Sequence, residues 1–188
     1  MMVQILFANQ LNTFVEQFEA TGFVNDYAKL VGETEQAKLE AKIVGINDST
    51  GIQFAILTLQ SLDNYTAKEV AEGVANFWGV GQKDIDNGIL ILASVRERAI
   101  HVALGEGTDD YVTDEYIKTL IKQVVKPAFQ KGEYARGIHD AIEKIYMQLS
   151  GTDLDRRVVE QKRNYYWLAG ILGLLLVGIV LFWLIKKR

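Results

Sequence analysis

An uncharged apolar segment near the C-terminus constrains this chain more than any other feature. From Tyr165 to Ile185 the sequence reads YYWLAGILGLLLVGIVLFWLI, with aromatic residues at both ends. About 20 apolar residues span the hydrocarbon core of a bilayer, and aromatic side chains gather at its two interfaces. A soluble helix of this length would show a polar face. We therefore predict one transmembrane helix that begins near Tyr166, ends at Ile185 and is followed by a short basic tail.

The charges that flank this segment do not orient it. Basic residues lie on both sides, namely Arg156, Arg157, Lys162 and Arg163 before it and Lys186, Lys187 and Arg188 after it. The positive-inside rule is therefore nearly balanced. The first ten residues, MMVQILFANQ, lack a basic region and are too short for a full signal peptide. They are either the remnant of a signal peptide or the ordinary first segment of a cytoplasmic domain, and the residues alone leave both open.

The rest of the chain is acidic. Residues 1–155 hold 13 Lys and Arg against 23 Asp and Glu, a net charge of −10, whereas residues 156–188 hold 7 against 1, a net charge of +6. Binding to nucleic acid needs a basic face, so this composition excludes a nucleic-acid partner and suits cations or basic partners. The absence of cysteine excludes disulfides and thiolate catalysis.

Helical and strand patterns alternate along the acidic part. Strands are predicted over 52–59, 88–94 and 99–104. Helices are predicted over 34–46 and 132–149, and a further helix begins at the Thr66–Glu69 capping box. Another helix begins at Thr113 and breaks or kinks at Pro127. A turn at 47–51 ends the first helix. This order predicts an α/β fold, with a small sheet between helices. Residues 52–94 should form a parallel right-handed unit, and 88–104 an antiparallel hairpin.

Two polar loops, 79–88 and 105–114, concentrate carboxylate and amide oxygens beside glycines. Calcium takes about six to eight such oxygens in irregular geometry. The run from Asp84 to Gly88 is not an EF-hand loop, because the later ligand positions are not filled. Spacing alone favours ordinary solvated turns over a cation site.

Signatures of the common enzyme classes are absent. The sequence has no Walker A loop and no G-x-S-x-G turn, and Gly79-Val-Gly81 has no third glycine in register. His101 lies within a predicted strand, where a packing role is favoured over catalysis. Lys83, Arg96 and Arg98 offer charge to a phosphate, but a solvated hairpin tip is the simpler interpretation. The catalytic residues, if any, are therefore unknown, and no organic cofactor is predicted.

Several short segments match, in order, the pattern of one known family. They are GFVNDYA from Gly22, GIQFAILTL from Gly51, FWGVG from Phe77, DNGILILA from Asp86, GEG from Gly105, VTD from Val112, PAF from Pro127 and GEY from Gly132. Residues about 22–150 thus resemble the TPM domain family, which includes the thylakoid lumen acid phosphatase of photosystem II repair and the bacterial YgcG-like proteins. No single segment is specific, but their combination is.

The resemblance implies a three-layer α/β/α sandwich, and in some members calcium binding or weak hydrolysis of phosphate esters. Carried over by position, the candidate calcium ligands are Asp26, Asp86, Asn87, Asp109 and Asp114. They would converge if all lay at the carboxyl edge of the sheet. The sequence departs from the family pattern at Asp86, where a second asparagine is common, and at Thr108, where an apolar residue is common.

The expected organisation has four parts: an N-terminal segment (1–21), a TPM-like domain (22–150), a charged linker (151–164) and a transmembrane helix with its tail (165–188). The resemblance orients the helix, placing the domain in the periplasm and the C-terminus in the cytoplasm of a single-pass protein of the cell membrane. The expected function is a non-enzymatic interaction or assembly module that binds calcium and a membrane-protein partner. The alternative is a metal-assisted acid phosphatase.

Overall fold

The computed structural model describes residues 10–108 and 110–152, together with residues 160, 163, 166, 167, 171 and 173. Most of the predicted transmembrane segment therefore lies outside the described residues. Within the described part of the chain, no helix is long and apolar enough to cross a membrane.

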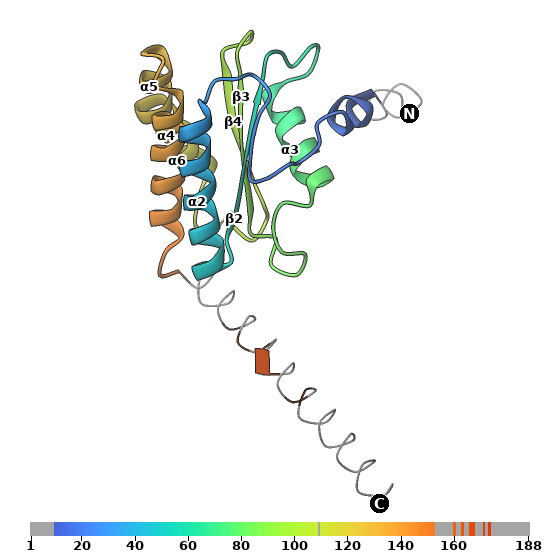
Figure 1. The fold of residues 1–188 in the computed structure, drawn as a ribbon, viewed down its shortest axis with the longest axis vertical. Helices are drawn as coiled ribbons and strands as arrows, with labels where there is room; N and C mark the ends of the chain where they lie inside the picture. The colour runs from blue at the N-terminus through green and yellow to red at the C-terminus, as the bar shows by residue number, and fades with distance from the viewer. Residues whose placement is uncertain are drawn as a thin grey trace, which may run out of the picture.

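A four-stranded mixed sheet forms the middle of the domain (Figure 1). Its strands are β1 (Val24–Asp26), β2 (Gln53–Leu59), β3 (Gly88–Ser94) and β4 (Ala99–Leu104), in the spatial order β1-β2-β3-β4. Strands β1, β2 and β3 are parallel, and β4 pairs antiparallel with β3. The predicted parallel unit and hairpin are confirmed, whereas β1 is an additional strand that the sequence did not predict.

Helices cover both faces of this sheet, which confirms the three-layer arrangement (Figure 1). One face carries α2 (Glu33–Thr50), α4 (Asp114–Leu120), a π-helical turn η1 (Ile121–Val125), α5 (Lys126–Gln130) and α6 (Tyr134–Leu149). The other face carries α3 (Ala67–Trp78). The predicted capping box forms at the start of α3, where Thr66 and Glu69 each accept the other's backbone N–H.

Strand β3 supplies both halves of the core, because all seven of its residues are buried. Successive side chains of a strand point to opposite faces. Ile89 and Ile91 accordingly pack with α2 and α6, and Leu90 and Leu92 pack with α3. A strand buried on both faces needs a continuous apolar run, which is why its sequence reads GILILAS.

Residues 10–18, which begin with a helical stretch, pack against α3. Val15 is buried in the α3 half of the core, and the indole N–H of Trp78 donates to the Phe18 carbonyl oxygen at 2.8 Å. The predicted N-terminal segment therefore contributes apolar contacts to the domain. Its first nine residues, which carry the VQILFA stretch, lie outside the described residues.

The outer edge of β1 is sealed by side chains of α2. The Glu40 carboxylate accepts the backbone N–H groups of Phe23 and Val24 at 2.7 and 2.8 Å. Gln36 Nε2 donates to the Val24 carbonyl oxygen at 2.9 Å. An unpaired strand edge is a template for pairing with another chain, and these bonds remove that template.

Helix α2 is longer than predicted. The turn residues 47–51 indicated an end near Ile46, but the helix continues to Thr50. The buried Thr50 hydroxyl donates to the Ile46 carbonyl oxygen at 2.7 Å, which lets threonine stay inside the last turn. The helix ends at Gly51, whose φ of 77° lies in the left-handed region that glycine adopts without strain.

The helical path through Pro127 is irregular one turn before the proline. The π-turn η1 separates α4 from α5, and Pro127 sits in the first turn of α5. Proline has no N–H to donate to a preceding carbonyl group, and a π-turn widens the local hydrogen-bond ladder. The predicted irregularity near Pro127 is therefore the π-turn η1, which lies just before the proline.

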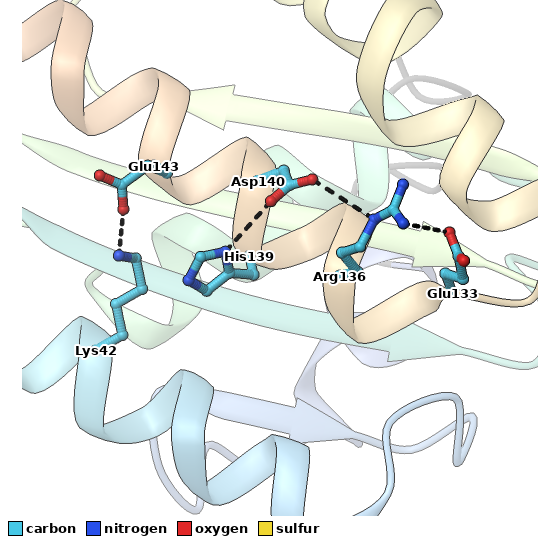
Figure 2. A network of polar contacts seen from close by, with 6 residues as sticks. All are labelled: Lys42, Glu133, Arg136, His139, Asp140 and Glu143. Carbon is cyan, nitrogen blue, oxygen red and sulfur yellow. Dashed lines mark hydrogen bonds and ion pairs between the residues drawn. The ribbon is translucent and has the colours of Figure 1, made fainter.

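Ion pairs line the outer surfaces of α2 and α6 (Figure 2). Lys42 of α2 pairs with Glu143 of α6 and so joins the two helices, and both side chains are about two-thirds buried or more. Along α6, Arg136 pairs with Glu133 at 3.0 Å and with Asp140 at 3.8 Å. The hydrogen bond from Lys42 is the main cause that lowers the pKa of the Glu143 carboxyl, against the opposing effect of burial.

Replacing Glu143 tests this inter-helix pair. We expect Glu143→Gln to lower the free energy of unfolding at pH 7 by about 0.5–1 kcal/mol, the range of partly exposed ion pairs. Because the folded-state pKa lies below the usual 4.5, the stabilisation is present above pH 4.5 and is lost as the pH falls through the folded-state pKa. Urea unfolding at pH 7 and pH 3 measures both effects. Glu35→Gln, which removes an exposed pair within α2, is the control and should change neither value.

Candidate functional site

The two predicted polar loops meet at one edge of the sheet. Residues 79–87 lead into β3, and the residues after β4 leave at the same edge, because β3 and β4 are antiparallel. This is the edge where the parallel strands begin, and we call it the amino edge (Figure 1). The Gly105 N–H donates to the Gly88 carbonyl oxygen at 2.8 Å, and the Gly107 N–H donates to the Asp86 carbonyl oxygen at 3.0 Å.

Glycine is required where these loops touch. A Cβ atom on Gly107 would lie 1.9 Å from the Ile85 carbonyl oxygen, and one on Gly105 would lie 2.2 Å from the Asp86 carbonyl oxygen. Both distances are far shorter than any real carbon–oxygen contact, and the obstacle is backbone that cannot rotate away. The Gly105-Glu106-Gly107 segment is therefore pressed directly against the backbone of residues 85–86.

Asp86 is the acidic residue at this junction. Its backbone has a φ of 51°, in the left-handed region that Asp and Asn enter more readily than other non-glycine residues. Its Oδ2 accepts the Glu106 backbone N–H at 3.0 Å. An asparagine oxygen can accept the same bond, which explains why either residue suits this position. The side chain remains exposed, so Asp86 presents a carboxylate to solvent from a fixed backbone.

Two polar residues of the loops are structural. Asn87 is fully buried; its Oδ1 accepts the Gln82 N–H at 2.8 Å and its Nδ2 donates to the Gly51 carbonyl oxygen at 3.0 Å. Thr108 is also fully buried, and its hydroxyl donates to the Gly105 carbonyl oxygen at 2.7 Å. This bond satisfies the threonine hydroxyl inside the core.

Asp26 does not join the other candidates. It ends β1 and so lies at the opposite, carboxyl edge of the sheet, whereas Asp86 and Asn87 precede β3 at the amino edge. The seven-residue strands β2 and β3 separate the two edges by about 20 Å. The expected convergence of all candidates at the carboxyl edge is therefore wrong, because both loops lie at the other end of the strands.

The Asp26 carboxylate also has a structural role. Its two oxygens accept the backbone N–H groups of Leu30 and Val31 at 3.0 and 2.8 Å, and the buried Thr58 hydroxyl donates to it as well. These bonds hold the turn between β1 and α2. An Asp26 engaged in this way has little remaining capacity to bind a cation.

The remaining candidates belong to the loop after β4. Asp114 is exposed in the first turn of α4, next to the N-cap residue Thr113. Asp109 lies outside the described residues. Among the residues that the structure describes, no group of three or more His, Asp or Glu side chains is placed to hold a metal ion. These residues by themselves therefore do not fit a closed calcium site.

An acidic pocket lies where the loops meet α3. This cavity of about 250 Å³ is lined by three carboxylate side chains, from Glu72, Asp86 and Glu106, and by no basic residue. Sequence reasoning found the loop residues but missed Glu72, which projects from the exposed side of α3. Glu72 lies on the turn of α3 that faces the loops, and only the tertiary fold reveals this position.

His101 lies near this pocket on β4, and its ring is half-buried. Burial is the largest cause that lowers the pKa of this imidazole, and the nearby Glu72 carboxylate partly offsets it. His101 is therefore mainly neutral at pH 7, which agrees with a packing role.

The domain that carries these loops matches a known protein family. A model of the TPM domain matches residues 24–148, which is about two-thirds of the chain and includes every strand and both loops. The chain belongs to the TPM domain family. A search of the curated proteins gives no match.

Solved structures share the fold. The N-terminal domain of a protein from P. gingivalis is 26% identical, with a TM-score of 0.64, over 73% of this chain and 87% of that one. The BA42 protein from Bizionia argentinensis is 20% identical, with a TM-score of 0.55, over 70% of this chain and 85% of that one. The N-terminal domain of a Corynebacterium glutamicum protein is 16% identical, with a TM-score of 0.52, over 71% of this chain and 86% of that one. The last two similarities concern the fold alone.

The contact between the loops gives a direct prediction. Gly107→Ala should lower the free energy of unfolding by about 1–3 kcal/mol, because the added methyl group forces the two backbones apart. Chemical denaturation measures this change. The matched control is Gly45→Ala in α2, where the new Cβ meets nothing within 4 Å. That variant should be neutral or more stable by about 0.5–1 kcal/mol, since alanine favours helix. Equal effects of the two substitutions would contradict the required close approach.

Proposed function

We propose that this TPM-domain protein is a membrane-anchored, extracytoplasmic interaction module that assists the assembly or repair of membrane proteins without a catalytic reaction of its own. The observation that carries the proposal is the acidic pocket at the amino edge, whose charged lining residues are Glu72, Asp86 and Glu106. The pocket would receive a cationic group of a partner protein, or a calcium ion whose remaining ligands are water or oxygens of the partner.

The chemistry of the pocket suits a small cation. Its volume of about 250 Å³ is below the usual range of about 300–1,000 Å³ for organic ligands, but it is ample for a lysine or arginine head group. Glu72 pairs with Lys68 of the preceding helical turn at 3.7 Å, whereas Asp86 and Glu106 form no ion pair with another residue that the structure describes. The lining therefore keeps an excess of negative charge, which attracts cations. The backbone contacts at Gly105 and Gly107 hold Asp86 and Glu106 in place before binding, so little conformational entropy is lost on binding.

The position of the pocket supports a partner in the same membrane. Helix α6 ends beside the loop after β4, where Gln148 Nε2 donates to the Tyr111 carbonyl oxygen at 3.2 Å. The chain continues from the end of α6 toward the apolar segment 165–185. If that segment is the anchor, the acidic pocket lies at the membrane-proximal end of the domain, within reach of a basic segment that a partner exposes at the outer surface of the same membrane.

Metal-assisted phosphatase activity is the alternative, and the geometry favours it less. A metal that activates phosphate must lie next to the phosphoryl oxygen, with basic groups at the same place. The lining of the acidic pocket has no basic residue, and the two cations that line the larger cavity at the opposite edge of the sheet, Arg98 and Lys126, are too far away to assist a metal there. If a purified sample hydrolyses phosphate esters, Asp86→Ala and Asp114→Ala should leave the rate unchanged. A loss of turnover in both variants would favour the phosphatase.

Thermal unfolding of the full chain in detergent tests cation binding. A ligand of the native state present at ten times its dissociation constant adds about 1.4 kcal/mol to the free energy of unfolding, and so raises Tm by about 3–5 °C. Calcium should give this increase if it occupies the pocket, and an arginine-rich peptide should give it if the pocket binds a partner. Neither ligand should act on a double Asp86→Asn, Glu106→Gln variant.

The matched control for these melts is Asp63→Asn. Asp63 is also an exposed aspartate in the left-handed region, with a φ of 52°, but it does not line the pocket. This variant should respond like the unmodified protein. An unchanged Tm with both calcium and peptide would argue against any cation site in the pocket.

Membrane topology is tested separately in cells. Protease added to spheroplasts should digest the domain while a C-terminal tag stays protected, since we place the domain outside and Lys186–Arg188 inside. Protection of the domain in intact spheroplasts, with digestion only after lysis, would reverse this orientation. Recovery of the protein in the soluble fraction would overturn the anchor itself.

A further inference from the structure

A second and larger pocket lies at the carboxyl edge of the sheet, far from the acidic one. This cavity of about 550 Å³ is lined by residues from the β1–α2 turn, the β3–β4 turn, β4, α5 and the start of α6. These elements meet at the end of the domain opposite the two polar loops (Figure 1). The volume is within the range of about 300–1,000 Å³ of small-molecule sites, and α/β folds place their ligands at this edge.

The charge of this pocket is opposite to that of the domain. Its lining includes two cationic residues, Arg98 and Lys126, and no acidic residue. Neither forms an ion pair with another residue that the structure describes, whereas Lys42 and Arg136 on the neighbouring surface do. In a domain with a large excess of carboxylates, two unpaired cations around one cavity favour an anionic ligand.

The remaining wall of the pocket is largely apolar. Phe129 and Tyr134 pack edge to face, with ring centroids 5.0 Å apart, and Leu30 and Ile100 complete this side. The face of an aromatic ring held in this way can pack against the apolar body of a ligand. The pocket thus combines a cationic side with an apolar side, which fits a molecule that has a charged head and an apolar body.

A backbone irregularity occurs at one of the cationic positions and directly before the other. Arg98 has a φ of 49°, an uncommon conformation for arginine, and its N–H donates to the Val95 carbonyl oxygen at 3.2 Å to close the turn. Lys126 directly follows the five-residue π-turn η1. Left-handed non-glycine residues and π-turns are costly and gather at functional sites. Here both place a positive charge on the rim of the same cavity.

We propose that this pocket binds a small organic carboxylate, with the carboxylate between Arg98 and Lys126 and the apolar body against Phe129 and Tyr134. The planar arginine guanidinium pairs with the two coplanar oxygens of a carboxylate, and the lysine adds a second charge-assisted bond. The proposal concerns binding without a chemical step. It depends neither on the acidic pocket nor on the membrane anchor.

Fluorine NMR on the full chain in detergent micelles tests this proposal. The probe is para-trifluoromethylbenzoate, and the corresponding neutral benzamide reports apolar partition alone. We expect saturable line broadening with the benzoate and at least about tenfold weaker binding of the benzamide, since each charge-assisted bond contributes about a factor of ten or more. Para-trifluoromethylphenyl phosphate is the third probe and should not bind more tightly than the benzoate.

Variants locate the binding site. Arg98→Asn keeps a residue that tolerates the left-handed backbone, and Lys126→Gln changes an exposed helix position; each should weaken benzoate binding about tenfold. Arg96→Asn is the matched control, because Arg96 lies on the same turn but does not line the cavity, and its affinity should stay within about twofold. Melting curves establish whether each variant is folded. If Arg98→Asn does not fold, Lys126→Gln alone is enough to test the site.

Several results would overturn the proposal. They are an absence of saturable binding at millimolar benzoate, equal binding of benzoate and benzamide, and an affinity that neither Arg98→Asn nor Lys126→Gln changes. Tighter binding of the aryl phosphate by tenfold or more would also overturn it, because the pocket would then be built for a phosphate group.

Discussion

The pairing of β3 with both of its neighbours is the interaction on which the rest of the domain depends. This strand is buried along its whole length, runs parallel to β2 and antiparallel to β4, and contacts helices on both faces. Because β3 has no exposed face, its two ends are its only access to solvent. Its first residue, Gly88, lines the acidic pocket, and its last residue, Ser94, lines the basic one. One strand thus separates two sites of opposite charge.

The sequence predicts the elements around this strand well, because their signals are local. The apolar runs of β2 and β3 and the Thr66–Glu69 capping box each reflect contacts within a few residues. Strand β1 lacks such a signal, since it has only three residues, VND, and two of them are polar. It is a strand because Glu40 and Gln36 bind its outer edge while β2 binds its inner edge.

Predicting the sites required the order and direction of the strands, which no local pattern contains. Asp26 and Asp86 look equivalent in the sequence, as acidic residues of polar turns. The fold places them at opposite edges, because one follows a parallel strand and the other precedes one. Glu72 and Lys126 are polar residues on exposed parts of helices, and only tertiary packing brings each to a cavity. The acidic net charge of the domain likewise gives no sign of a pocket whose only charged lining residues, Arg98 and Lys126, are cations.

The separation of the two pockets also clarifies which functions this fold can combine. The acidic residues of one pocket and the cations of the other cannot act on one phosphate group, whereas binding of two different ligands is sterically independent. Two sites of opposite charge at opposite ends would let one domain contact a partner protein at one end and a small molecule at the other. Any coupling between them would have to pass along β3 or through the helices packed on it.

The glycine contact between the two loops has a consequence for how such a domain can evolve. In many α/β proteins, loops at one edge of a sheet change length independently, and new specificities arise one loop at a time. Here Gly105 and Gly107 lie against the backbone of residues 85–86, so an insertion in either loop would displace the other. Evolutionary change at this edge is therefore expected in side chains such as Glu72 and Glu106. Their charge and size can change while the backbone that carries them keeps its conformation.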